Sequence, residues 1–270
     1  MPAFLTSLDD GTRLECRTFG TISPQAPVLV FLHEGLGCAS LWRDFPERLS
    51  RATGLPALWY SRAGYGGSSG VEWPRPVTYM HHEALVVLPA LLAEFGISNA
   101  ILFGHSNGAS ISLIHGGSGQ ADKLRGIIVE APHVFLEDVT VESIRGLMEQ
   151  YEHGDLRLKL ARHQGENVDC AFRGFAETWL VPENAASWNI LDYVEKIRVP
   201  TLVFQGENDQ YATVRQVEAI EDAAPGFVES AIVQHCGHHP HFEATDLVLE
   251  RSTRFIRKLM EKPGASGPPA

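Results

Sequence analysis

The chain has 270 residues, which is enough to bury a large hydrophobic core, and chains of this length commonly form one catalytic domain with an insertion. Its 22 Lys and Arg residues stand against 33 Asp and Glu residues, so the formal net charge is -11. This charge argues against nucleic acid as a partner and favours a small organic molecule. We expect no membrane contact and a cytoplasmic location, because no apolar run reaches the length of a membrane span and residues 1–5 do not resemble a signal peptide.

The cysteines are scattered along the chain without the C-x-x-C spacing of a zinc or redox motif. Their spacing does not suggest a disulfide framework either. We expect reduced thiols with mostly structural roles. The four residues are Cys16, Cys38, Cys170 and Cys236.

The chain opens with two short runs, 4–7 and 13–19, which flank the turn sequence D-D-G and predict an antiparallel hairpin. Six later runs are apolar throughout, as strands covered by helices on both faces must be. Helical patterns separate them, and Pro89 is expected to bend one of these helices without ending it. The alternation predicts an α/β fold with a mostly parallel central sheet flanked by helices. The six runs are 28–32, 58–60, 101–103, 127–129, 201–204 and 231–233.

The alternation breaks in the middle of the chain, where we expect two to four amphipathic helical stretches and no strand. We predict a helical cap inserted over residues 134–195, with residues 1–133 and 196–262 forming the core of the domain. The tail, 263–270, is rich in Pro and Gly and should be disordered. The clearest helical stretches of the cap are 141–151 and 156–163.

The cap is rich in aromatic side chains. Most of them, including Phe172 and Phe175, are expected to form the cap's own core. One or two should face a bound molecule instead, and Trp179 and Trp188 are the candidate substrate contacts.

The pentapeptide G-H-S-N-G at residues 104–108 lies between the predicted strand 101–103 and an apolar helical run. A serine on a sharp strand-to-helix turn is held in a strained conformation that exposes its hydroxyl, and the flanking glycines permit close passage of the chain. Ser106 is therefore the predicted nucleophile. A solvated serine on a glycine-rich turn is the alternative, and the partners of Ser106 must decide between the two readings.

A serine hydroxyl needs a base to remove its proton and a carboxylate to orient that base. Asp209 follows the apolar strand 201–204 and is the predicted acid, with Glu130 at another strand end as the alternative. His238 lies in the loop after the strand 231–233 and is the predicted base. The sequence therefore offers a complete Ser-His-Asp set.

Four histidines between residues 235 and 241 would also suit a metal ion. Pro240 constrains this loop, however, and no carboxylate or thiol completes a familiar ligand spacing. The pair His81 and His82 begins a predicted helix and is expected to form a polar first turn. We therefore expect neither a metal nor a cofactor.

Acyl transfer also needs hydrogen-bond donors for the oxygen that becomes negative in the transition state. The glycine-rich loop 33–37 follows the strand 28–32, and its backbone N–H groups can point into the site. The backbone N–H groups of Gly35 and Asn107 are the predicted oxyanion hole. Their neighbours Glu34 and His105 are further candidate substrate contacts.

The order Ser106, Asp209, His238 resembles that of the α/β-hydrolase-fold serine hydrolases, and the resemblance covers nearly the whole chain. The loop 62–69, R-A-G-Y-G-G-S-S, is similar to the family's loop after the next strand. One departure concerns the oxyanion loop, where the family commonly has glycine and this chain has Glu34. An ionised carboxylate beside an oxyanion would oppose catalysis, so we expect Glu34 to turn away, toward Arg62.

The resemblance implies a carboxylic-ester hydrolase that works through an acyl-enzyme. A carbon–carbon bond hydrolase of a ring-cleavage product is an alternative, although that group often has an aromatic residue after the catalytic histidine and this chain has His239 and Pro240. A cofactor-free oxygenase or lyase on the same scaffold is a weaker option. Haloalkane dehalogenase or epoxide hydrolase chemistry would need a carboxylate nucleophile, which Ser106 excludes. From another class, the scaffold would suit a small-molecule receptor.

Overall fold

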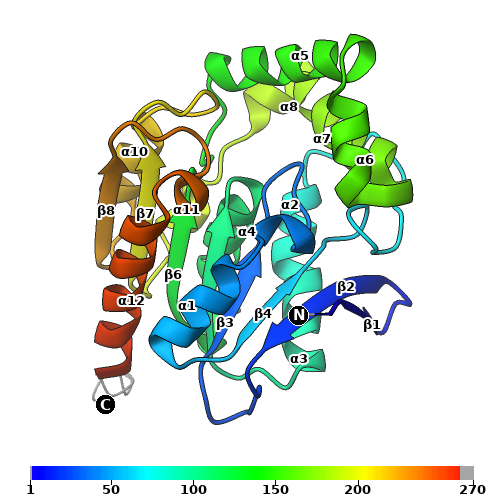
Figure 1. Ribbon diagram of the computed structural model, residues 1–270. Helices are drawn as coiled ribbons and strands as arrows, with labels where there is room; N and C mark the ends of the chain where they lie inside the picture. Colours follow the sequence, from blue (N-terminus) through cyan, green and yellow to red (C-terminus); the bar gives the residue numbers. More distant parts are fainter. Residues whose placement is uncertain (1, 262–270) are drawn as a thin grey trace.

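The computed structural model describes residues 2–261 of the chain, so the predicted tail 263–270 lies outside the described residues. Among the described residues, eight strands form one sheet in the order β1-β2-β4-β3-β5-β6-β7-β8 (Figure 1). The β1–β2 and β2–β4 pairs are antiparallel and all other pairs are parallel. The strands are β1 (Phe4–Ser7), β2 (Arg13–Phe19), β3 (Val28–Leu32), β4 (Ala57–Tyr60), β5 (Ala100–His105), β6 (Leu124–Glu130), β7 (Thr201–Gly206) and β8 (Val228–Val233).

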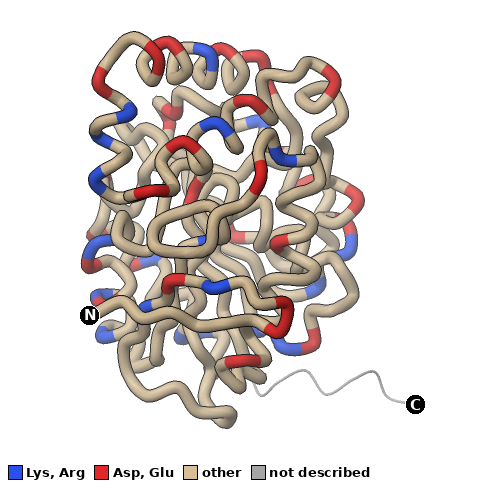
Figure 2. Tube along the Cα trace, turned by 90° about the vertical axis from the view of Figure 1, so that its right-hand side faces the viewer, with Lys and Arg blue, Asp and Glu red and all other residues tan. Residues whose placement is uncertain are grey.

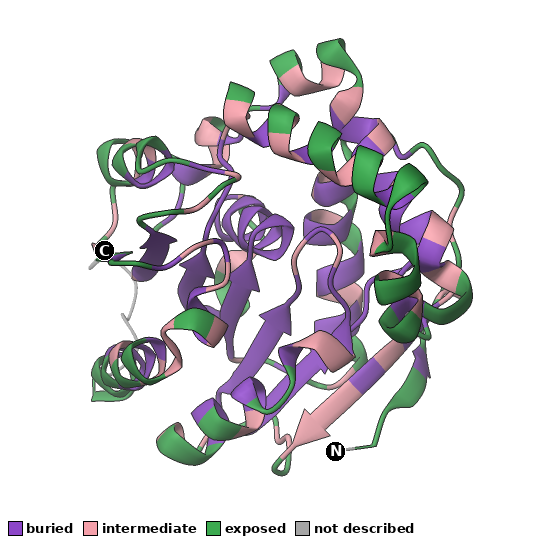
Figure 3. Cartoon of the chain, turned by 45° about the horizontal axis from the view of Figure 1, so that its top comes forward, coloured by how far each residue is buried: buried purple, intermediate pink, exposed green. Residues whose placement is uncertain are grey.

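Helices cover both faces of the sheet, which is why the central strands β3, β4 and β5 are buried at every position and are mostly apolar. Strand β3 shows this directly, because Val28, Val30 and Leu32 belong to one hydrophobic core while Leu29 and Phe31 belong to a second core on the opposite face. Figure 3 shows the same arrangement, with buried strands inside and helices exposed only on their outer sides. The predicted mostly parallel α/β sheet is therefore confirmed.

One layer of helices contains α1 (Phe45–Thr53) and α12 (Thr245–Glu261), which pack against each other. The other contains α4 (Asn107–Gly116), against which α9 (Leu191–Val194) and a long helix of residues 79–94 pack. That helix runs without a break from Tyr79 to Glu94 through Pro89, which does not end it, as expected. This long helix consists of α2 (Tyr79–His82), the π-helical turn Glu83–Val87 and α3 (Leu88–Glu94). Two further helices of the core are α10 (Arg215–Ala223) and α11 (Pro240–Glu243).

The helices between β6 and β7 lie over the carboxyl ends of the parallel strands (Figure 1). Five α-helices occur there, more than the two to four expected, because the two shortest have six and four residues and show no helical period in the sequence. The limits of the cap at residues 134 and 195 stay a prediction. The helices are α5 (Asp138–His153), α6 (Leu156–Gln164), α7 (Val168–Leu180), α8 (Pro182–Ser187) and α9 (Leu191–Val194).

The states of the cysteines and the positions of the charged residues can be compared with the expectations from composition. All four cysteines are buried and unpaired, as expected. In Figure 2 the Lys and Arg positions alternate with Asp and Glu positions along the chain. Within residues 2–261, no helix combines the length and the apolar character needed to cross a membrane.

Candidate active site

Ser106 occupies the turn between β5 and α4 with φ 53° and ψ -114°, a conformation that costs a non-glycine residue on the order of 1–3 kcal/mol. The chain passes very close to itself on both sides of this turn. A Cβ on Gly104 would lie 2.3 Å from the carbonyl oxygen of Gly108, and a Cβ on Gly108 would lie 1.9 Å from that of Leu32. The two flanking glycines are therefore required for the turn that presents Ser106.

Asp209 and His238 form a buried pair. The Nδ1 atom of His238 lies 2.9 Å from both carboxylate oxygens of Asp209, whose side chain is fully buried. The amide of Gln205 and the backbone N–H of Tyr211 donate to the same carboxylate at 2.9 and 2.8 Å. Burial alone would raise the pKa of Asp209, but the hydrogen bond and charge of His238 hold it well below its usual range. The carboxylate is therefore ionised and fixes the orientation of the imidazole.

The alternative acid, Glu130, belongs to a different pair. Its carboxylate lies 2.5 Å from Nδ1 of His241, and both side chains are buried. Their neighbours are aromatic, since the rings of His241 and Trp42 lie 4.7 Å apart. Asp209 and not Glu130 is therefore the carboxylate that contacts His238.

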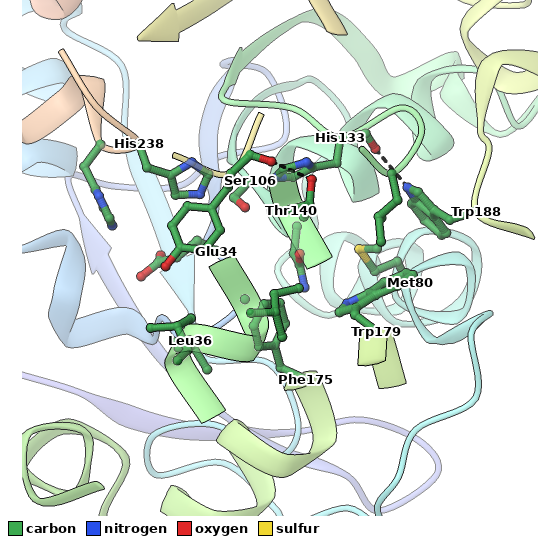
Figure 4. Close-up of a pocket in the computed structure, with 17 residues that line it drawn as sticks. Glu34, Leu36, Met80, Ser106, His133, Thr140, Phe175, Trp179, Trp188 and His238 are labelled. Carbon is green, nitrogen blue, oxygen red and sulfur yellow. Dashed lines mark hydrogen bonds between the residues drawn. The ribbon is translucent and has the colours of Figure 1, made fainter. Parts of the chain in front are cut away.

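Ser106 and His238 line one cavity of about 110 Å³ between the sheet and the cap (Figure 4). In Figure 4, Glu34 and His238 lie on one side of Ser106 and the two tryptophans on the other. The cap side of the wall is almost entirely apolar. It consists of Leu136, Thr140, Ile144, Leu147, Phe175, Trp179 and Trp188.

Gly35 and Asn107, the predicted oxyanion donors, both line this cavity. Asn107 is the first residue of α4, so its backbone N–H has no intrahelical acceptor. A Cβ on Gly35 would lie 2.6 Å from the ring of Phe175, so glycine lets the cap rest directly on the loop. Both residues therefore line the cavity, and the role of their N–H groups as oxyanion donors stays a prediction.

The cap aromatics divide between two positions. Trp179 and Trp188 line the cavity with their rings edge to face at 5.1 Å. Phe175 lines it as well, although we expected it in the cap's own core, because Gly35 has no side chain and so lets α7 pack directly against the oxyanion loop. Phe172 does lie in that core, stacked on Tyr151 at 3.7 Å.

The expectation for Glu34 was wrong. Arg62 binds the Glu34 backbone carbonyl at 2.8 Å, while the carboxylate faces Nδ1 of His105 at 3.6 Å. Burial would raise the pKa of Glu34, but its contact with His105 and the charge of that histidine lower it well below its usual range. Burial would lower the pKa of His105, but the contact with Glu34 raises it. The two groups therefore form an ion pair at the wall of the cavity.

His105 is also placed differently from its predicted role. It is fully buried behind the cavity wall, since the alternating direction of side chains along β5 turns it away from the space above Ser106. It therefore cannot contact a substrate directly. Glu34 does line the cavity.

His133 was missed by the sequence reasoning. It follows β6, lines the cavity, and its Nδ1 atom is buried without a hydrogen-bond partner among the described residues. Burial and the charge of His238 lower its pKa to about 4, so it is neutral near pH 7. Its place directly after an apolar strand is the signal that would have found it, because the other site residues share that place.

The atoms best suited to hold a metal belong to Glu34, His105 and His239, and they lie within 4.8 Å of one another. The sequence did not reveal this cluster, because Glu34 lies in a loop that is far along the chain from His105 and His239. Metal binding would need an unprotonated Nδ1 on His105, whereas the raised pKa of His105 and the facing carboxylate favour a protonated one. The raised pKa of His105 therefore favours an ion pair with Glu34, and zinc binding is tested below.

The chain is similar to many solved hydrolases, whereas no curated protein matches it. An esterase from Thermogutta terrifontis has a TM-score of 0.72 at 18% identity, over 96% of this chain and 99% of that one. An esterase from Rhodococcus sp. has a TM-score of 0.73 at 18% identity, over 96% of this chain and 100% of that one. A bacterial membrane phospholipase A has a TM-score of 0.75 at 17% identity, over 97% of this chain and 87% of that one. At these identities the likeness shows the fold alone.

The match to a family model is more specific than these structural likenesses. The model described as "Alpha/beta hydrolase family" matches residues 29–251, which include the turn at Ser106 and the pair of Asp209 and His238. The match spans most of the chain, so the protein belongs to the alpha/beta hydrolase family.

Proposed function

We propose that this hydrolase cleaves a small carboxylic ester through an acyl-enzyme on Ser106. One observation carries the proposal: a serine on a strained, glycine-flanked turn shares a cavity with His238, whose other ring nitrogen is held by a buried, ionised aspartate. A hydroxyl needs such a base to become a nucleophile at neutral pH. The esterases of similar fold are consistent with this chemistry.

In the proposed reaction, Ser106 attacks the ester carbonyl while His238 takes its proton. Asp209 holds the imidazole in the required tautomer and stabilises the imidazolium. The backbone N–H groups of Gly35 and Asn107 donate to the oxyanion. His238 then protonates the leaving alcohol, and water activated by the same imidazole releases the acid from Ser106.

The cavity limits the size of the substrate. Its volume is about 110 Å³, and an apolar cavity of roughly 150 Å³ is known to hold benzene. The space beside Ser106 therefore fits a short acyl chain or one small ring. We infer that short acyl esters are preferred over long ones.

Labelling with a fluorophosphonate, followed by turnover of nitrophenyl esters with acyl chains of two to twelve carbons, tests this proposal. We expect one label per chain, on Ser106, and the highest kcat/KM at short chain lengths. Ser106→Ala should abolish labelling and lower kcat by about a thousandfold or more while the fold survives. Labelling of Ser106→Ala, or its retention of turnover, would show that another residue is the nucleophile.

A further inference from the structure

His105 joins the three loops from which the candidate active site is built. It precedes Ser106 on the nucleophile turn, and its Nε2 atom lies 2.7 Å from the backbone carbonyl of His238. A carbonyl oxygen only accepts, so Nε2–H is the donor. Its Nδ1 atom faces Glu34 of the oxyanion loop at 3.6 Å. One buried imidazole therefore touches the base loop and the oxyanion loop at the same time.

The surroundings are shaped for this contact. A Cβ on Gly37 would lie 2.2 Å from the carboxylate of Glu34, so glycine at that position leaves the space that the carboxylate fills. The backbone carbonyl of Glu34 is held separately by Arg62 at 2.8 Å. The backbone of Glu34 is therefore held by Arg62, while its carboxylate faces His105 at ion-pair distance.

The backbone around His238 is held on both sides as well. The carboxylate of Glu243 accepts from the backbone N–H groups of Gly237 at 2.7 Å and His239 at 3.0 Å. These bonds position the loop relative to α11, whereas the bond from His105 positions it relative to Ser106. The contact with His105 is thus a direct link between the backbone of the base and the residue that precedes the nucleophile.

We propose that the Glu34–His105 ion pair is a brace that holds the base loop and the oxyanion loop in register with Ser106. This proposal rests on the proposed function, because it assigns both residues as positioning residues for that chemistry. It accounts for a glutamate where related hydrolases commonly have glycine. A loop displacement of about 1 Å can lower a rate about a hundredfold, so the expected effect lies in kcat.

Two substitutions of His105 separate its two contacts. The amide nitrogen of glutamine reaches about as far as Nε2, so His105→Gln keeps a donor for the His238 carbonyl. The amide of asparagine reaches only about as far as Nδ1, so His105→Asn loses that donor. We expect His105→Asn to lower kcat on a short nitrophenyl ester by about 10- to 100-fold with KM changed less than about threefold. His105→Gln keeps the bond to the His238 carbonyl but loses the ion pair with Glu34, so it should recover only part of this loss, to about the level of Glu34→Gln.

Glu34→Gln tests the other end of the brace. It should lower kcat in the same way, and the double variant with His105→Gln should be no worse than the poorer single variant, because both substitutions break the same Glu34–His105 pair. Glu130→Gln is the matched control, since it breaks the other buried acid–histidine pair, with His241. It should lower the unfolding temperature similarly while kcat stays within about threefold of the parent.

Three results would overturn the brace. The first is a kcat of His105→Asn equal to the parent. The second is a loss of kcat that merely follows the unfolding temperature across all variants, without recovery in His105→Gln. The third is binding of one zinc ion by the chelator-treated protein that disappears in Glu34→Gln and His239→Asn, since the cluster would then be a metal site.

Failure of the proposed function would look different from failure of the brace. If the parent protein is neither labelled by the fluorophosphonate nor active on any ester, the proposed function falls. Crystal structures of His105→Asn and Glu34→Gln then decide the inference independently. A displaced loop at Gly35 or a displaced His238 supports the brace, and unmoved loops overturn it.

Discussion

At the scale of single residues, the site depends on which groups are kept charged. Asp209 is buried, yet it accepts bonds from His238, Gln205 and Tyr211, and these keep the carboxylate ionised. A carboxylate left without these donors would protonate, because burial disfavours the charged form. The orienting acid is therefore defined by its donors as much as by its position after a strand.

Replacing the two buried acids should separate catalysis from stability. Asp209→Asn should lower kcat by about 10³- to 10⁴-fold, because the asparagine amide favours the wrong tautomer of His238. Glu130→Gln should mainly lower stability, because its carboxylate contacts His241. Ester turnover and thermal unfolding of both variants provide the test. A larger loss of kcat in Glu130→Gln would assign the acid to Glu130.

His133 should make the fold sensitive to acid. Its pKa is about 4 in the folded protein, against an ordinary value of 6.5, so between these values the unfolded chain binds a proton that the folded chain does not. Stability therefore falls as the pH drops through this window, by at most about 1.4 kcal/mol per pH unit for this group. Urea unfolding of His133→Phe should show a smaller loss between pH 7 and pH 5 than the parent. Equal losses would contradict the assignment.

The sequence indicated the three residues of the predicted triad because each follows an apolar strand, and parallel strands end at one edge of the sheet. It did not indicate the partner of Glu34. Arg62 and His105 are both distant in sequence from Glu34, and the choice between them depends on the side-chain direction along β5 and on the space left by Gly37. Such packing is a property of the folded chain and not of any local pattern.

At the scale of elements, strands were easier to predict than cap helices. The central strands, such as β3 and β5, are short and mostly apolar runs, because both of their faces are buried. The helices α8 and α9 have six and four residues, which is less than two turns, so no periodicity could reveal them. The short helices of the cap could therefore be located only in the structure. The position of the cap between β6 and β7 could be predicted, because the alternation of strands and helices breaks there.

The aromatic residues of α7 should divide into those that set specificity and those that set stability. Trp179 lines the cavity, so Trp179→Ala should enlarge it and shift the preferred ester toward longer acyl chains. Phe172 is buried against Tyr151 away from the cavity, so Phe172→Ala should cost about 3–5 kcal/mol without changing chain-length preference. Turnover of the ester series and urea unfolding of both variants check this. A shift in preference in Phe172→Ala alone would contradict the division.

At the scale of the whole molecule, charge and enclosure act together on the substrate. The chain carries a formal net charge of -11, and the described residues that line the cavity include Glu34 but no Lys or Arg. The cavity lies between the sheet and an apolar cap wall, so a ligand entering it loses water. An anionic group there would have no cationic partner, and burying an unpaired ion costs several kcal/mol.

We therefore expect the enzyme to discriminate against acyl groups that carry a carboxylate. Nitrophenyl butyrate and nitrophenyl hemisuccinate have acyl chains of equal length, and only the second is charged at pH 7. The kcat/KM of the hemisuccinate should be lower by about a hundredfold or more, after correction for their uncatalysed rates. Raising the salt concentration should narrow this gap only slightly, because salt screens exposed charges far more than buried ones. Equal rates at low salt would show that the acyl group stays in water, and a gap that vanishes in salt would place the discrimination at the protein surface.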